Sequence, residues 1–186
     1  GIVLWEAREA VDERSSHWES GAFIRLDDEV EHPELMAHFT TMRYDINTVA
    51  RGYPTADVVF SMHPNVTRAR SQGYVKLRSN DASASLIIDP RHYSDPDGYD
   101  ERVVLEGIRF ARRMAEQPAL SAVIARELAP GPEVQSESDL SEYARRTGNT
   151  VYHPAGTCKM GSIQDPMAVV DPYLRVRGVK ALRVAD

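Results

Sequence analysis

The order of the predicted elements is the feature that most constrains the fold, because short strands come first and helices follow. Strand-like segments, most of which alternate apolar and polar residues, occur at 1–7, 22–26, 34–41, 58–62, 73–79 and 86–88. Such alternation is typical of antiparallel strands with one buried face. The order predicts an α+β fold, in which an antiparallel sheet of about five to six strands is covered on one face by helices. At a length of 186 residues, a single domain over 1–186 is expected.

The segment 34–41 indicates which side chains face the core. Leu35, Ala37 and Phe39 alternate with Met36 and His38, so the two sets lie on opposite faces of a strand. If the first set faces the core, His38 faces the other side. The residues between Met62 and Gly73 are mostly polar and are predicted to form a loop.

The clearest helical pattern follows Ser94-Asp95-Pro96. Ser94 or Asp95 would supply the N-cap and Pro96 the first turn, and the helix would stop at Pro118. The arginines on this helix and on the later ones are interpreted as solvated side chains.

Two further helices are predicted. The first covers residues 119–128. The second begins at the capping-box-like pair Ser136 and Asp139 and stops at Gly148.

Composition excludes several classes of protein. The net charge of −6 argues against a nucleic-acid partner. No apolar run approaches the roughly 20 residues that span a bilayer, and no metal site is predicted. The one cysteine, Cys158, is expected to be a packed structural thiol, and a cytoplasmic location is expected because no internal disulfide is possible.

Residues 150–161 combine a histidine, a proline, a cysteine and two glycines. Pro154 biases His153 toward an extended backbone, while Gly156 and Gly161 permit a sharp path or the close approach of a flat ligand. Histidine suits proton transfer near neutral pH, since its unperturbed pKa is about 6.5. A histidine in such a loop is also commonly a turn residue bonded to backbone. The pattern alone therefore leaves both roles open.

Several segments together resemble the C-terminal signature of the glucose–methanol–choline (GMC) oxidoreductases, flavin enzymes that oxidise alcohols. These segments are 152–161, 165–171, 174–179 and 182–186, and the similarity continues upstream through 52–55, 64–71 and 89–93. It covers nearly the whole chain and is strongest to the choline oxidase and choline dehydrogenase branch. The resemblance implies the substrate-binding domain of a GMC enzyme.

The resemblance also implies roles for individual residues. His153 would be catalytic and would handle the hydroxyl proton while a hydride passes to FAD. Trp18 and Tyr152 would belong to an aromatic cage around a trimethylammonium group. His38 and Val151 would contact the substrate, and His153 and Pro154 would contact the flavin. Structural roles stay open: Trp18 as a core residue beside Phe23, Tyr152 as a packing residue and His38 as a solvent-facing one.

No GxGxxG motif occurs in the chain, so the resemblance implies that the FAD-binding domain lies largely before Gly1 and after Asp186. The chain would then be a substrate-binding fragment, inactive alone and not expected to retain FAD. The intact parent would oxidise choline to betaine aldehyde and glycine betaine.

Other functions and partners are left open by the sequence. The first alternative is a GMC enzyme for a neutral alcohol, a sugar or an aryl alcohol, and the second is a non-enzymatic quaternary-ammonium binding module. Besides the alcohol and the missing FAD-binding domain, a second copy of the chain is a possible partner. Whether the parent is an oxidase or a dehydrogenase stays open.

Overall fold

The computed structural model describes residues 2–9, 18, 20–41 and 46–185. The chain forms two compact units. Unit 1 comprises residues 1–72 and 91–149, and unit 2 comprises residues 73–90 and 150–186.

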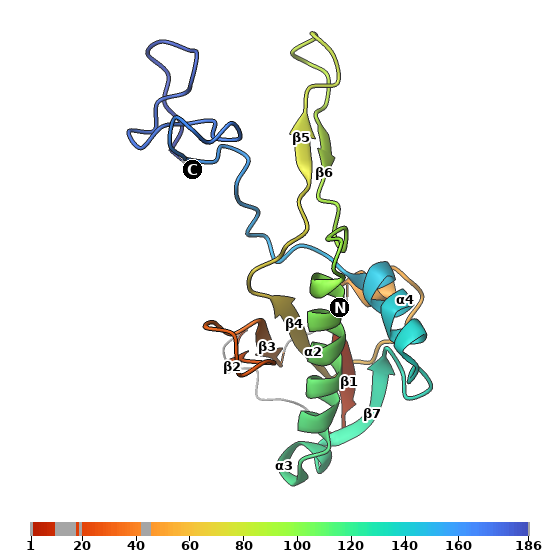
Figure 1. The fold of residues 1–186 in the computed structure, drawn as a ribbon. Helices are drawn as coiled ribbons and strands as arrows, with labels where there is room; N and C mark the ends of the chain where they lie inside the picture. Colours follow the sequence, from red (N-terminus) through yellow and green to blue (C-terminus); the bar gives the residue numbers. More distant parts are fainter. Residues whose placement is uncertain (1, 10–17, 19, 42–45, 186) are drawn as a thin grey trace. The chain divides into compact units, whose positions relative to one another are not determined.

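Unit 1 contains a five-stranded antiparallel sheet with the strand order β2-β3-β4-β1-β7 (Figure 1). The strands are β1 (Val3–Ala7), β2 (Ser20–Ile24), β3 (Leu35–Thr40), β4 (Val59–Val66) and β7 (Ile124–Ala129). The predicted α+β class and the antiparallel sheet are confirmed. Leu35 and Ala37 of β3 are buried, as the alternation in this segment predicts.

The helices of unit 1 are α1 (Ile46–Val49), α2 (Tyr99–Ala115), α3 (Pro118–Ser121) and α4 (Glu137–Thr147). Helix α2 packs across β4, β3 and β1, and α4 packs beside it (Figure 1). The close approach depends on Gly107, because a Cβ there would lie 2.3 Å from Cβ of Pro64 and 2.9 Å from Cδ1 of Leu35. The core between sheet and helices includes Leu4, Ile108 and Tyr143.

Helix α2 starts later than the sequence predicts. Its N-cap is Gly98, at φ 61°, and no side chain caps it from that position. The Asp95 carboxylate instead accepts hydrogen bonds from the backbone N–H of Tyr99, at 2.5 Å, and of Asp100, at 3.4 Å. Asp95 thus satisfies backbone N–H groups of the first helical turn from a position before the helix. This explains why the sequence pattern indicates Asp95 as the N-cap.

Helix α4 agrees with its prediction. Ser136 is the N-cap, its hydroxyl accepts a hydrogen bond from the Asp139 backbone N–H, and the helix ends at Gly148.

The predicted helix over 119–128 is wrong. A single turn, α3, is followed by strand β7, which pairs antiparallel with β1. The side chains of this segment suit a helix, but pairing with β1 buries Leu128 and Ala129 and satisfies backbone groups along β1. This tertiary pairing outweighs local helix propensity.

Strand β4 is longer than predicted, because the residues assigned to a loop after Met62 continue the strand to Val66. The described pairing of β1 with β4 ends at Met62, whereas β3 pairs with β4 as far as Val66. Pro64 therefore lies where β4 has a single described neighbour, a position at which a strand tolerates proline.

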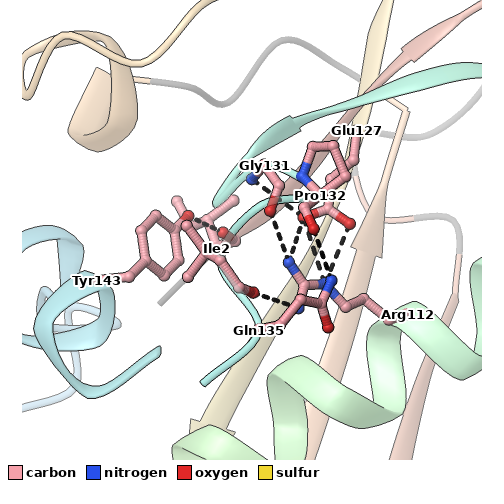
Figure 2. Close-up of polar contacts among 8 residues, drawn as sticks. Ile2, Arg112, Glu127, Gly131, Pro132, Gln135 and Tyr143 are labelled. Atoms are coloured by element: carbon pink, nitrogen blue, oxygen red, sulfur yellow. Dashed lines mark hydrogen bonds and ion pairs between the residues drawn. The ribbon is translucent and has the colours of Figure 1, made fainter. Parts of the chain in front are cut away.

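The interpretation of the helix arginines as solvated is wrong for Arg112, as Figure 2 shows. Its Nη2 lies 2.7 Å from Oε1 of Glu127 and donates to the carbonyl of Gly131 at 2.9 Å, while Nη1 donates to the carbonyl of Val134 at 2.8 Å. The side chain joins α2 to β7 and to the turn that follows β7.

Unit 2 contains the hairpin of β5 (Tyr74–Lys76) and β6 (Ile87–Asp89), together with a C-terminal segment of turns and isolated bridges. The guanidinium of Arg177 organises these turns by donating to the backbone carbonyls of Gly161, Ser162 and Asp165. Cys158 is a free, partly buried thiol.

Candidate functional site

The face of the sheet that α2 does not cover carries a row of polar side chains on β3 and β4. In the register of these strands His38 lies opposite His63, Met36 opposite Asn65, and Thr40 opposite Ser61. Residues directly opposite share a face, and the alternate set, which includes Leu35, packs with Tyr99 and Val103 of α2. The two histidines, Asn65 and Ser61 therefore lie together on the face away from α2.

Trp18 lies against both histidines. Its ring centroid is 5.4 Å from that of His38 and 5.5 Å from that of His63, with interplanar angles of 62° and 77°. These are edge-to-face contacts, a favourable arrangement for aromatic rings. Trp18 is 48% exposed, so part of the indole remains accessible to a ligand. The structure thus brings together two of the predicted site residues, Trp18 and His38.

Hydrogen bonds connect the polar residues of this face. Nδ2 of Asn65 lies 2.8 Å from Nδ1 of His38 and 2.9 Å from the backbone carbonyl oxygen of His63. Nε2 of His63 lies 2.7 Å from the hydroxyl of Ser61. The His38 ring is therefore contacted at Nδ1 by the amide of Asn65 and also by the ring of Trp18.

His63 is buried, and this burial is the main reason that its pKa is lowered to about 3. The imidazole is neutral at any pH near 7. A neutral, buried histidine bonded to Ser61 is suited to holding its neighbours in place rather than to exchanging protons with a ligand.

His63, Asn65 and Ser61 were missed as site residues because their segment was assigned to a loop. The sequence signal for them is that the polar residues Ser61, His63 and Asn65 occur at every second position, as on one face of a strand that begins at Val59.

The other predicted site residues, Val151, Tyr152, His153 and Pro154, belong to unit 2 and are exposed. Tyr152 has a positive φ of 65°, and its backbone N–H donates to the hydroxyl of Thr150 at 3.0 Å. A non-glycine residue at positive φ is strained and is often found at functional positions.

The two glycines of this segment differ from each other. A Cβ at Gly161 would lie 2.8 Å from Cβ of Ala168 and 2.9 Å from Oδ2 of Asp165. The atoms that approach Gly161 closely therefore belong to the protein and not to a ligand. Gly156 has a φ of 92° and open space around it, so it provides the sharp path.

Among the residues that the structure describes, no three His, Cys, Asp or Glu side chains are grouped so that they could hold a metal ion. Within the same residues, none of the helices has the length and apolarity needed to cross a membrane.

The fold and this face define an α+β domain in which the half-exposed Trp18 and the partly buried His38 and Asn65 lie together on the sheet face away from α2. A sequence profile of the GMC oxidoreductases matches residues 69–186. The chain belongs to the GMC oxidoreductase family, as its sequence signature predicts.

Curated relatives agree with this assignment. The chain is 48% identical over its whole length to choline oxidase of Arthrobacter globiformis, and it spans 34% of that protein. It is 38% identical, over 92% of its length, to oxygen-dependent choline dehydrogenase 1 of Chromohalobacter salexigens and spans 30% of that protein. The chain therefore covers about a third of the length of these relatives.

Solved structures show the same fold. Pyridoxine 4-oxidase from Mesorbium loti matches the whole chain with a TM-score of 0.80 at 27% identity, and the match covers 36% of that protein. Formate oxidase from Aspergillus oryzae matches with a TM-score of 0.81 at 19% identity over 40% of its chain, which bears on the fold alone.

Proposed function

We propose that this chain supplies the alcohol-binding part of an FAD-dependent oxidoreductase that oxidises choline to betaine aldehyde and glycine betaine. The observation that carries the proposal is the contact of the half-exposed Trp18 with His38 on the sheet face away from α2. The 48% identity to a choline oxidase supports the choice of substrate.

Choline has two ends with different needs. Its trimethylammonium group cannot donate a hydrogen bond, so aromatic faces are suitable partners, each worth about 0.5–2 kcal/mol. Its hydroxyl group needs a polar partner. Trp18 provides the first kind of contact and His38 the second, and their ring centroids are 5.4 Å apart. Tyr152 is proposed as a further aromatic contact and Val151 as an apolar one.

Oxidation of the alcohol removes a proton from oxygen and a hydride from carbon. When bound, FAD supplies the hydride acceptor. His153 is proposed to receive the hydroxyl proton, a role that histidine can fill near neutral pH. Its exposure in unit 2 leaves the imidazole accessible to a substrate.

The residues of this chain are suited to contact the isoalloxazine ring of FAD and not to bind its nucleotide part. The sequence has no glycine-rich motif for the diphosphate, and His153 and Pro154 are exposed side chains that could contact the isoalloxazine ring. The nucleotide is proposed to be bound by a separate FAD-binding domain.

The test compares choline with 3,3-dimethylbutanol, its neutral analogue, as substrates of the FAD-containing protein. We expect a clear preference for choline in kcat/KM. Replacing Trp18 by alanine should raise KM for choline much more than KM for the analogue, because only choline gains a cation–π contact.

Equal kcat/KM values for the two compounds would contradict the cage and favour a neutral alcohol, sugar or aryl alcohol. Reduction of the flavin is measured as the loss of its visible absorption. Tight choline binding without this loss would favour a binding module.

A further inference from the structure

We infer that Asn65 is a positioning residue that holds His38 in the tautomer with its proton on Nε2. The inference rests on the proposed function only for the identity of the ligand that His38 meets. In the strand register Met36 is directly opposite Asn65, and His38 lies two residues further along β3 on the same face. Such diagonal neighbours are within reach of each other across an antiparallel pair.

The backbone of His63 fixes the orientation of the Asn65 amide. Nδ2 of Asn65 lies 2.9 Å from the carbonyl oxygen of His63, which can only accept a hydrogen bond. If the amide were reversed, its own oxygen would face that carbonyl, and two acceptors would meet without a hydrogen between them. The nitrogen of Asn65 must therefore face His63.

This orientation decides the hydrogen bond to His38. The same Nδ2 lies 2.8 Å from Nδ1 of His38. An amide NH2 has two hydrogens to donate and accepts none, so Nδ1 must be the acceptor. A neutral imidazole that accepts at Nδ1 carries its proton on Nε2.

The tautomer determines what His38 can do for an alcohol. Nε2–H is the one polar hydrogen of the neutral ring, so in this tautomer the ring donates through Nε2 and accepts only through Nδ1. The basic nitrogen is Nδ1, which Asn65 occupies. His38 in this tautomer cannot remove the hydroxyl proton, and another group, proposed above as His153, must do so.

The surroundings keep the ring in this position. Trp18 packs edge-to-face on both His38 and His63, and the hydroxyl of Ser61 bonds to the neutral His63 ring. The carbonyl that orients Asn65 thus belongs to a residue that is itself held in place.

The test is NMR of the ring nitrogens in FAD-containing protein labelled with ¹⁵N-histidine, with the His38 signals assigned by their loss in His38→Gln. Without substrate, we expect a protonated Nε2 and an unprotonated Nδ1. In Asn65→Asp, which has the same shape but cannot donate, Nδ1 should become protonated. The control Thr67→Val removes a hydrogen bond from Thr67 to the Pro33 carbonyl at the end of the same strand and should keep the wild-type pattern.

A proton on Nδ1 of His38 in the wild type would overturn the inference, and so would an unchanged pattern in Asn65→Asp. The kinetic readout is kcat/KM, which we expect to fall about 10- to 100-fold in Asn65→Asp, the range found when a metal-ligating histidine loses the group that orients it. If the wild type does not oxidise choline, the proposed function fails, while the NMR signals still decide the role of Asn65.

Discussion

Arg112 of α2 and Glu127 of β7 form a partly buried ion pair, with Nη2 of the arginine 2.7 Å from Oε1 of the glutamate and only 14% and 13% of the side chains exposed (Figure 2). The pair joins a helix to an edge strand whose helical sequence preference would otherwise oppose the sheet. It therefore helps to select the observed fold as well as to stabilise it.

Replacing Glu127 by alanine should lower the free energy of unfolding by about 1.5–3 kcal/mol, because the partly buried Arg112 would lose its charge-assisted hydrogen bonds to the carboxylate. Urea denaturation of the protein measures the change.

The matched control for Glu127 is Arg126→Ala on the same strand, where the partner Glu6 forms an equally short but exposed ion pair of 2.7 Å. That change should cost less than about 1 kcal/mol. Similar losses in the two variants would show that the Arg112 pair does not stabilise the fold.

Replacing Gly107 by alanine should destabilise the protein by about 1–3 kcal/mol. Alanine normally stabilises a helix interior relative to glycine by roughly 0.5–1 kcal/mol. Here, however, the added Cβ would lie 2.3 Å from Cβ of Pro64. Thermal unfolding should show a lower Tm for Gly107→Ala and almost no change for Arg113→Ala, an exposed position of the same helix. A higher Tm for Gly107→Ala would mean that α2 and β4 are not in close contact.

His63 should make the protein less stable as the pH falls. Its pKa is about 3 in the folded protein, against the ordinary histidine value of 6.5, so between these values only the unfolded chain takes up the proton. The stability contributed by this histidine is complete above pH 6.5 and is lost by about 1.4 kcal/mol for each pH unit below it, down to about pH 3.

Unfolding measured from pH 7 to pH 4 checks this dependence. His63→Gln should flatten the pH dependence, whereas Ser61→Ala, which leaves the buried imidazole in place, should keep it. An unchanged slope in His63→Gln would assign the acid sensitivity to other groups.

Replacing His153 by alanine should lower kcat of the FAD-containing protein by about 10²- to 10⁴-fold, the usual contribution of an acid–base group. Steady-state turnover of choline measures the effect, with FAD content checked to exclude loss of the cofactor. His32→Ala, at an exposed histidine of unit 1, is the control and should retain full turnover. Near-normal turnover in His153→Ala would remove this residue from the mechanism.

Local patterns predicted the parts of the fold that depend on neighbouring residues. The alternation of Leu35, Ala37 and Phe39 correctly placed His38 on the opposite face of its strand, and Ser136 marked the start of α4. Both signals depend on contacts within a few residues, namely side-chain direction along a strand and a cap in the first helical turn.

The sequence by itself determined the α+β class, the face on which His38 lies and, through its signature, the membership of the GMC family. Only the tertiary structure decided that 124–129 is a strand, that β4 continues through His63 and Asn65, and that Arg112 is partly buried in an ion pair. Each of these depends on a partner distant in the chain, such as β1 for β7 and β3 for β4. The site has the same dependence, because the hydrogen bond that fixes His38 joins residues 27 positions apart.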